Sequence, residues 1–262
     1  SQSTYGATFG ACRLELAGTD GVFPVYEDLR LGHGIFCLDG TTLAPTGGTL
    51  VVTSAVHPKS RTILYVDEGG VVFDVPNGTC LTLGGDGETF LFGGPGGVVK
   101  RGAGRLRFAT VDDLHEGPTV IREGTYELAT DTASRDFTLE GGVLDLTAGN
   151  HPLELNLTNL VLAAGTELKL KLSPEGGDML DMRGGQLLCP GRGTAVLDVT
   201  VQAGTPAGDY AVLLADELSD AAWTTLSCRI RAPGRRAACF RSADGTALVI
   251  RVHPLATTIL VR

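Results

Sequence analysis

Short segments in which apolar and polar residues alternate recur along much of the chain. In RLRF, Leu106 and Phe108 alternate with Arg105 and Arg107. Because successive side chains of a β-strand point to opposite faces, this period of two predicts strands with one buried and one exposed face. By the same alternation, further inward-facing residues are Tyr126, Leu128, Leu144, Leu146, Leu168, Leu170 and Leu172. The chain is therefore predicted to be all-β.

Most of these segments follow a glycine, and the glycines recur along the chain. They stand at Gly48, Gly70, Gly78, Gly104, Gly124, Gly142, Gly165 and Gly185. A period of about 20 residues predicts stacked repeats, which share a continuous core that a single repeat cannot form. The prediction is a β-solenoid with glycine at its corners. The alternative is an antiparallel β-sandwich, which regularly spaced Asn-Gly and Asp-Gly turns would favour.

Composition removes several other classes of protein. The 262 residues include 37 glycines without a Gly-X-Y period, and 43% are hydrophobic, so collagen and disorder are both excluded. No apolar stretch reaches the roughly 18 residues of a membrane span. The first residues, SQSTYGATFG, contain no signal peptide. The net charge of −9 argues against a nucleic-acid partner.

Basic residues gather at the carboxyl-terminal end of this acidic chain. From Cys228 onward the sequence contains seven arginines and one acidic residue, Asp244, so the net charge of this segment is 7 − 1 = +6. Such an end is either a solvated face or a contact surface for an acidic partner, which includes another copy of the chain. The second interpretation predicts self-association into a head-to-tail filament through Arg229, Arg231, Arg235 and Arg236.

Two pairs of cysteines are candidates for disulfides. Cys228 and Cys239 would lie opposite each other in a hairpin that turns at Pro233 and Gly234. Opposed cross-strand Cβ atoms are near the separation that a disulfide needs, so we predict a bridge and an oxidising compartment. The alternative is two buried free thiols. Cys12 and Cys37 are predicted to stack in neighbouring repeats, whereas nothing in the spacing pairs Cys80 with Cys189.

One stretch, residues 97–128, resembles the autotransporter-associated β-strand repeat, also called the passenger-associated transport repeat. The matching positions are Gly97, Lys100, Gly102, Gly104, Leu106, Gly117, Thr119, Ile121, Gly124, Thr125 and Leu128. Degraded copies continue to about residue 205, and AGTPAGDYAVLLADELSD is similar to the end of such passengers. The resemblance implies a right-handed parallel β-helix on a bacterial cell surface or in secreted fibrous and adhesive proteins, and it does not imply an enzyme.

The search for chemistry yields no catalytic residue, cofactor or metal site. The chain has no G-x-S-x-G, H-E-x-x-H or P-loop motif and no Cys/His cluster with zinc spacing. Parallel β-helix enzymes that cleave polysaccharides place carboxylates of neighbouring turns about 5–10 Å apart on one outer face. Asp145 and Asp198 are predicted to face outward, but their spacing does not show that they meet. A polysaccharide-binding or polysaccharide-cleaving module is therefore the alternative function.

Taken together, these patterns predict three regions and one main function. Residues 1–45 form an irregular amino-terminal cap, 46–215 the β-solenoid, and 216–262 a carboxyl-terminal β-hairpin cap. The predicted function is that of a nonenzymatic structural or adhesive protein, secreted or on the bacterial cell surface. Its expected partners are other copies of itself, a cell surface or a glycan, with no nucleic acid and no membrane span.

Overall fold

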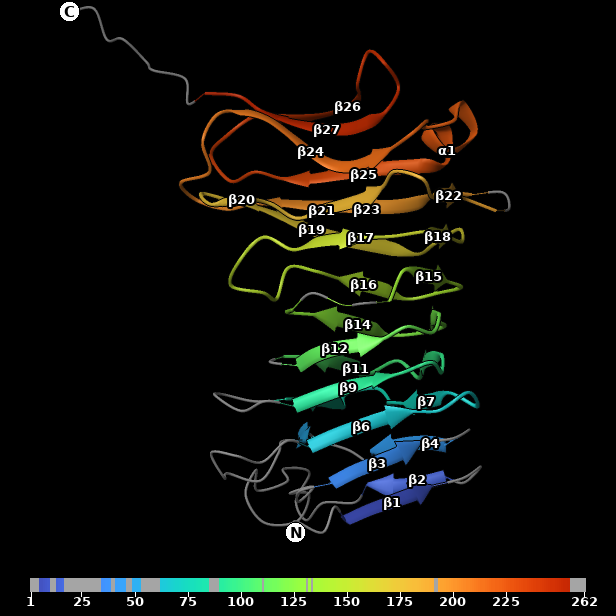
Figure 1. Ribbon diagram of the computed structural model, residues 1–262. Coiled ribbons are helices and arrows are strands. Elements are labelled where there is room, and N and C mark those ends of the chain that lie inside the picture. The colour runs from blue at the N-terminus through green and yellow to red at the C-terminus, as the bar shows by residue number, and fades with distance from the viewer. Residues whose placement is uncertain are drawn as a thin grey trace, which may run out of the picture.

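A computed structural model gives the arrangement of most of the chain. It describes residues 5–9, 13–16, 34–38, 41–45, 49–52, 62–84, 90–109, 111–130, 132, 134–190 and 193–254. These residues form parallel sheets with almost no helix, so the all-β prediction is confirmed. The strands are stacked along an elongated body, with β1 near one end and β26 and β27 at the other (Figure 1).

Four sheets, named A to D here, contain all of the described strands. Sheet A consists, in spatial order, of β1 (Tyr5–Phe9), β3 (Gly34–Leu38), β6 (Thr62–Val66), β9 (Phe90–Gly94) and β12 (Val111–His115). Sheet B consists of β2 (Arg13–Leu16), β4 (Thr41–Pro45), β7 (Val71–Asp74), β10 (Val98–Arg101), β13 (Thr119–Ile121), β15 (Asp136–Leu139), β18 (Asn159–Leu162) and β22 (Gln186–Leu188).

Sheet C runs beside sheets A and B, and sheet D lies toward the carboxyl-terminal end. Sheet C consists of β5 (Thr49–Val52), β8 (Cys80–Leu83), β11 (Arg105–Phe108), β14 (Thr125–Leu128), β16 (Val143–Asp145), β19 (Glu167–Ser173), β23 (Ala195–Val201) and β25 (Leu226–Arg231). The short β20 (Gly176–Gly177) pairs with the end of β19. Sheet D consists of β17 (Glu154–Asn156), β21 (Met179–Met182), β24 (Gly208–Ala215), β27 (Ala247–Val252) and β26 (Ala237–Arg241).

The chain visits these sheets in a repeating order, and each passage is called a coil here. From β6 to β14 it runs through sheets A, B and C three times, and each strand pairs in parallel with its counterpart in the previous coil. Among the described strands, the antiparallel pairs are β19–β20, β24–β27 and β26–β27. The parallel pairing rules out the antiparallel β-sandwich, and the stacking is consistent with a β-solenoid.

The coils differ in length although their strands stay in register. In sheet C, the paired residues Thr125 and Val143 are 18 apart in sequence (143 − 125), whereas Ala195 and Leu226 are 31 apart (226 − 195). The predicted period of about 20 residues therefore describes the middle coils and not the later ones. The extra residues are placed between strands, because the hydrogen-bonded register leaves no room for them within a sheet.

The core is built from columns of apolar side chains, one from each coil. In sheet C, paired positions place Leu81, Leu106, Tyr126, Leu144, Leu168 and Leu197 in one such column, each buried. All the inward-facing residues predicted from the alternation are buried. Each is worth roughly 1.5–3 kcal/mol relative to exposure, so a column of them offsets much of the entropy cost of ordering the coils.

One outward-facing lysine departs from the simple alternation of buried and exposed residues. Lys171 lies on the same face of β19 as Lys169, yet it is only 2% exposed. Its Nζ lies 3.5 Å from Oδ1 of Asp178, which follows β20, and 3.4 Å from the carbonyl oxygen of Leu146. Burial raises the pKa of Asp178, although the N–H groups of Leu153 and Lys171 donate to it. Neighbouring loops thus cover this part of sheet C.

The carboxyl-terminal end differs from the predicted hairpin. Strand β25 pairs in parallel with β23 in sheet C, whereas β26 pairs antiparallel with β27 in sheet D. The two strands flanking Pro233 and Gly234 therefore do not pair with each other. The physical reason is that β25 completes the sheet C ladder, and the chain then crosses to sheet D. Helix α1 (Asp220–Thr225), capped by Ser219, precedes β25.

The amino-terminal region also contributes to the stack. Within residues 1–45, β1 pairs in parallel with β3 and β2 with β4. These are the same sheets that later coils extend. The boundaries at residues 45 and 215 remain predictions.

Lys100 occupies an inward-facing position at a corner between sheets B and C. Its side chain is fully buried, and its Nζ donates to the carbonyl oxygens of Arg101 (3.0 Å), Gly102 (2.6 Å) and Glu123 (3.1 Å). The corner is tight: Gly124 has φ +69°, and a Cβ there would lie 2.3 Å from the carbonyl oxygen of Gly104. Lys100 therefore links the corners of two successive coils through their backbone carbonyl groups.

Burial makes the stability contributed by Lys100 dependent on pH. Desolvation lowers the pKa of Lys100 from 10.5 to about 8, against the opposing charges of Glu123 and Asp74. The folded chain thus loses this proton before the unfolded chain does. Between these two values the free energy of unfolding should rise with pH by about 1 kcal/mol per pH unit, relative to a Lys100→Met variant. Below pH 8 the lysine is charged in both states, and the difference between the two proteins should be constant.

The measurement is urea unfolding of both proteins from pH 7 to pH 11. Subtracting the variant's curve removes the contributions of the tyrosines and cysteines that also titrate in this range. Curves that stay parallel over the whole range would contradict the buried charge.

Candidate functional site

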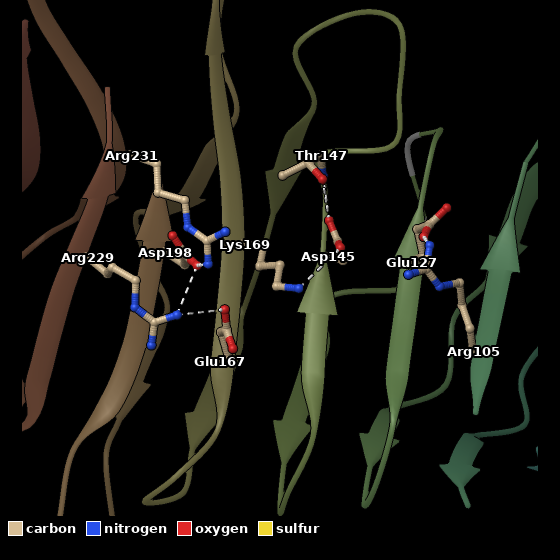
Figure 2. Close-up of polar contacts among 9 residues, drawn as sticks. All are labelled: Arg105, Glu127, Asp145, Thr147, Glu167, Lys169, Asp198, Arg229 and Arg231. Atoms are coloured by element: carbon tan, nitrogen blue, oxygen red, sulfur yellow. Dashed lines mark hydrogen bonds and ion pairs between the residues drawn. The ribbon is translucent and has the colours of Figure 1, made fainter. Parts of the chain in front are cut away.

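The outer face of sheet C carries a column of charged residues, one from each of six successive coils. Strand pairing places Arg107, Glu127, Asp145, Lys169, Asp198 and Arg229 next to one another in this order. Figure 2 shows these side chains, apart from Arg107, with their neighbours on the same face. We call this set the charged column. Parallel register positions each member directly beside the members one coil away, at the strand spacing of about 4.8 Å.

At the amino-terminal end of the charged column, two arginines cover one carboxylate. The Glu127 side chain is only 3% exposed. Its Oε2 accepts from Nη1 of Arg105 at 2.5 Å, and its Oε1 lies 3.1 Å from Nε of Arg107. Both arginines come from β11, one coil earlier. The carboxylate is thus neutralised by two cations that remain partly in solvent.

In the middle of the column, Asp145 is held by a turn and by a lysine. Its Oδ1 accepts from the backbone N–H (3.0 Å) and the hydroxyl (2.6 Å) of Thr147. Its Oδ2 lies 3.8 Å from Nζ of Lys169. The two candidate carboxylates Asp145 and Asp198 stand in the same column two coils apart, about 10 Å by the strand spacing, with Lys169 between them.

At the carboxyl-terminal end, two of the predicted self-association residues bind within the chain. Asp198 is 3% exposed, and its Oδ2 accepts from Nη1 of Arg229 (3.1 Å) and Nη2 of Arg231 (2.6 Å). Arg229 also lies 3.6 Å from Oε1 of Glu167. Arg235 donates to the carbonyl oxygen of Thr205. Arg236 is exposed. The structure thus uses three of these four arginines in contacts inside one molecule.

The arrangement of the column limits the chemistry it can perform. Its carboxylates are buried and bound by cations, whereas a glycosidase needs one carboxyl group free to give a proton and another free to attack or activate water. Among the described residues, no group of three or more His, Cys, Asp and Glu side chains is placed to hold a metal ion. The ion pairs therefore leave the column's carboxylates without the freedom that this chemistry requires.

A second feature, which the sequence analysis missed, is a groove of about 570 Å³ at the corner where sheet D meets sheet B. We call it the corner groove; Arg135, Asn156, Leu157, Thr158, Asp181 and Arg183 line it. Three successive coils supply these residues, near the starts of β15 and β18 and the end of β21. These residues are far apart in sequence. Their proximity can be predicted only when the register between coils of unequal length is known.

No aromatic side chain lines the corner groove. Among the described residues, the only large hydrophobic side chains that are exposed are Tyr65 (38%) and Leu188 (48%). The corner groove therefore lacks the aromatic side chains on which a sugar ring would stack.

The thiols of Cys228 and Cys239 lie together, although their strands belong to different sheets. Both are free thiols. A hydrogen bond between them, together with burial, raises the pKa of Cys228, and the same hydrogen bond lowers the pKa of Cys239. The contact joins β25 of the last coil of sheet C to β26 of the terminal hairpin. Cys12 lies outside the described residues, so its pairing with Cys37 remains a prediction, as does the bridge between Cys228 and Cys239.

Comparison with known proteins identifies one relative of part of the chain. Over 112 residues, 42% of this chain, it is 34% identical to the "Adhesin BmaC autotransporter" of Brucella suis biovar 1 (strain 1330). The matched region is 3% of that adhesin's length. No protein-family model matches the chain, so the specific repeat family suggested by residues 97–128 is not confirmed. Across the described residues, no helix is long and apolar enough to cross a membrane.

The pairing of Asp198 with two arginines can be tested by removing both arginines and leaving its negative charge unpaired. A variant with both Arg229→Met and Arg231→Met leaves a buried carboxylate without its hydrogen-bonded cations, and we expect it to lose about 3 kcal/mol of unfolding free energy. Adding Asp198→Asn to this variant removes the stranded charge and should recover most of the loss. Urea unfolding at neutral pH measures all three proteins.

The matched control is Arg122→Met, because Arg122 pairs with Glu140 and both side chains are about half exposed. This control should change stability little. If the double variant is no less stable than the control, the buried pairing does not support the coil.

A disulfide between Cys228 and Cys239 would link the last coil to the terminal hairpin. Oxidation by oxidised glutathione would remove two protons and two electrons from the thiols and form one S–S bond. We expect non-reducing peptide mapping to find this link, and dithiothreitol to lower the melting temperature of the wild-type protein. The melting temperature of Cys239→Ser should not respond to the reductant, whereas Cys80→Ser should behave as wild type. Recovery of both cysteines as free thiols after oxidation would disprove the bridge.

Proposed function

We propose that the chain is a rod-like segment of a nonenzymatic adhesive protein on a bacterial cell surface. The observation that carries this proposal is the similarity to an autotransporter adhesin, in a chain whose strands stack in parallel coils. The rod would be a right-handed parallel β-helix, as the resemblance of residues 97–128 to passenger repeats implies. The same similarity supports an extracellular location and a role in contact with a surface.

The proposed organisation keeps the three regions predicted from the sequence. Residues 1–45 form an amino-terminal region, residues 46–215 the main body, and residues 216–262 a carboxyl-terminal cap. The antiparallel pairing of β26 and β27 supports the last assignment, because a reversed hairpin ends the run of parallel strands in sheet D.

A parallel stack suits adhesion because it holds outward side chains at fixed intervals. The charged column has cations and carboxylates in a fixed order on one face, and its ion pairs hold their rotamers. A surface organised before binding loses less conformational entropy when a partner docks. Head-to-tail assembly through the basic end remains a further proposal, for which the exposed Arg236 is the best-placed residue.

A glycan-binding module is the second candidate function, and the corner groove favours it. The groove brings together two arginines, an amide, a hydroxyl and a carboxylate, the groups that commonly form hydrogen bonds with sugar hydroxyls. Cleavage is less well supported than binding, since Asp181 is the one carboxylate lining the groove and it is paired with Arg183.

Adhesion can be measured with microspheres that carry the purified chain. We expect them to attach to an epithelial monolayer at least fivefold more than albumin-coated microspheres do, and to release no reducing sugar from a panel of polysaccharides. A rate of sugar release above the buffer control would contradict the nonenzymatic part of the proposal. Attachment no greater than that of albumin would contradict the adhesive part.

A further inference from the structure

We infer that the corner groove binds an oligosaccharide that carries a carboxylate. The inference rests on the proposed adhesive function and names a chemical class of ligand for it. The groove differs from the charged column in the ion pairing of its arginines. One arginine of the groove forms no ion pair with a carboxylate of the described residues. That difference points to a ligand with both a negative charge and hydroxyl groups.

Arg135 provides the position for the charge. It is exposed at the first of the three corners, and no carboxylate among the described residues forms an ion pair with it. A guanidinium group offers two parallel N–H donors that match the two oxygens of a carboxylate. The exposed Asn156 and Thr158 lie on the next coil and offer an amide and a hydroxyl.

The other end of the groove is already neutralised. Asp181 accepts from Nε and Nη2 of Arg183, and the charges of Glu154 and Asp216 also act on this arginine. An anion there would meet three carboxylates. The Nη1 group of Arg183 makes no hydrogen bond to a described residue, so this end is suited to neutral hydroxyl groups. The ligand's carboxylate should therefore lie at Arg135 and its hydroxyls toward Arg183.

The spacing of the coils sets a minimum length for the ligand. Arg135 and Arg183 are two coils apart, about 10 Å along the stack by the strand spacing. A single sugar ring is too short to reach both, whereas a disaccharide or trisaccharide spans this distance. The groove is open to solvent and its lining residues come from three successive coils, so it extends along the stack.

The walls of the groove are rigid before any ligand binds. The carbonyl oxygen of Arg135 accepts from the N–H groups of Thr158 (2.7 Å) and Asn159 (3.1 Å), and the N–H of Leu157 donates to the carbonyl oxygen of Asp181 (2.8 Å). These bonds fix the three corners relative to one another. Only the exposed side-chain ends need to be ordered on binding.

The decisive experiment compares matched acidic and neutral sugars by calorimetric titration of the full chain. The probes are trigalacturonate with its methyl ester, and 3′-sialyllactose with lactose. We expect at least one acidic probe to bind, and at least tenfold more tightly than its neutral counterpart. Arg135→Gln should weaken that binding at least tenfold, and Arg183→Gln should weaken acidic and neutral probes alike.

The control variant is Arg122→Gln, which removes an exposed arginine paired with Glu140 away from the groove. It should bind the acidic probe as wild type does, and melting curves should show that all three variants are folded. Equal affinity for acidic and neutral probes, no binding of any probe, or an unchanged affinity in Arg135→Gln would each overturn the inference. Microspheres that carry the Arg135→Gln variant separate the two proposals. If they attach as well as wild-type microspheres do, the proposed role of the corner groove is refuted and the adhesive function is not. If wild-type microspheres themselves fail to attach, the adhesive function is refuted.

Discussion

The parallel hydrogen-bonded ladder between coils is the constraint on which the rest of the structure depends. Apart from the short β20, each strand of sheets B and C is held in register by the strand one coil away. A residue's neighbours are therefore set by its position in the coil and not by distance in sequence. Inside the stack this produces columns such as Leu106, Tyr126 and Leu144. Outside, it brings charges of several coils within ion-pair distance.

The same register explains how buried charge is tolerated on both sides of the sheets. On the outer face, Glu127 and Asp198 are covered by arginines of an adjacent coil, which keep their own ends in water. At the inner corner, Lys100 has no acid in direct contact and is satisfied by carbonyl oxygens of two coils. Glu127, Asp198 and Lys100 therefore each make at least one contact that joins two coils.

Local pattern was sufficient to predict the strands and their faces, and insufficient to predict what lies beside what. Leu144 and Leu168 follow from alternation because a period of two needs no knowledge of distant residues. Lys100 is two residues after Val98 in β10, so alternation places both side chains on the same, inward face of the strand. This pattern was sufficient to predict that Lys100 is buried.

The sites depended on information that a single sequence does not contain. Cys228 and Cys239 meet because the chain crosses from sheet C to sheet D, and not through the hairpin that their spacing suggested. The corner groove needs the alignment of coils whose lengths differ, which neither repeat spacing nor residue type specifies. Arg135 and Arg183 are 48 positions apart in sequence (183 − 135) and gave no motif.

The unequal lengths of the coils have a consequence for how such a surface can change. Because an added residue is accommodated between strands, a loop can grow or shrink while the ladders on either side remain aligned. Binding specificity could then be altered one corner at a time, with no compensating mutation required in the core. In a fold of this kind, the strands and the core must stay constant for the chain to remain folded. The loops between strands, which are exposed to binding partners, are free to vary.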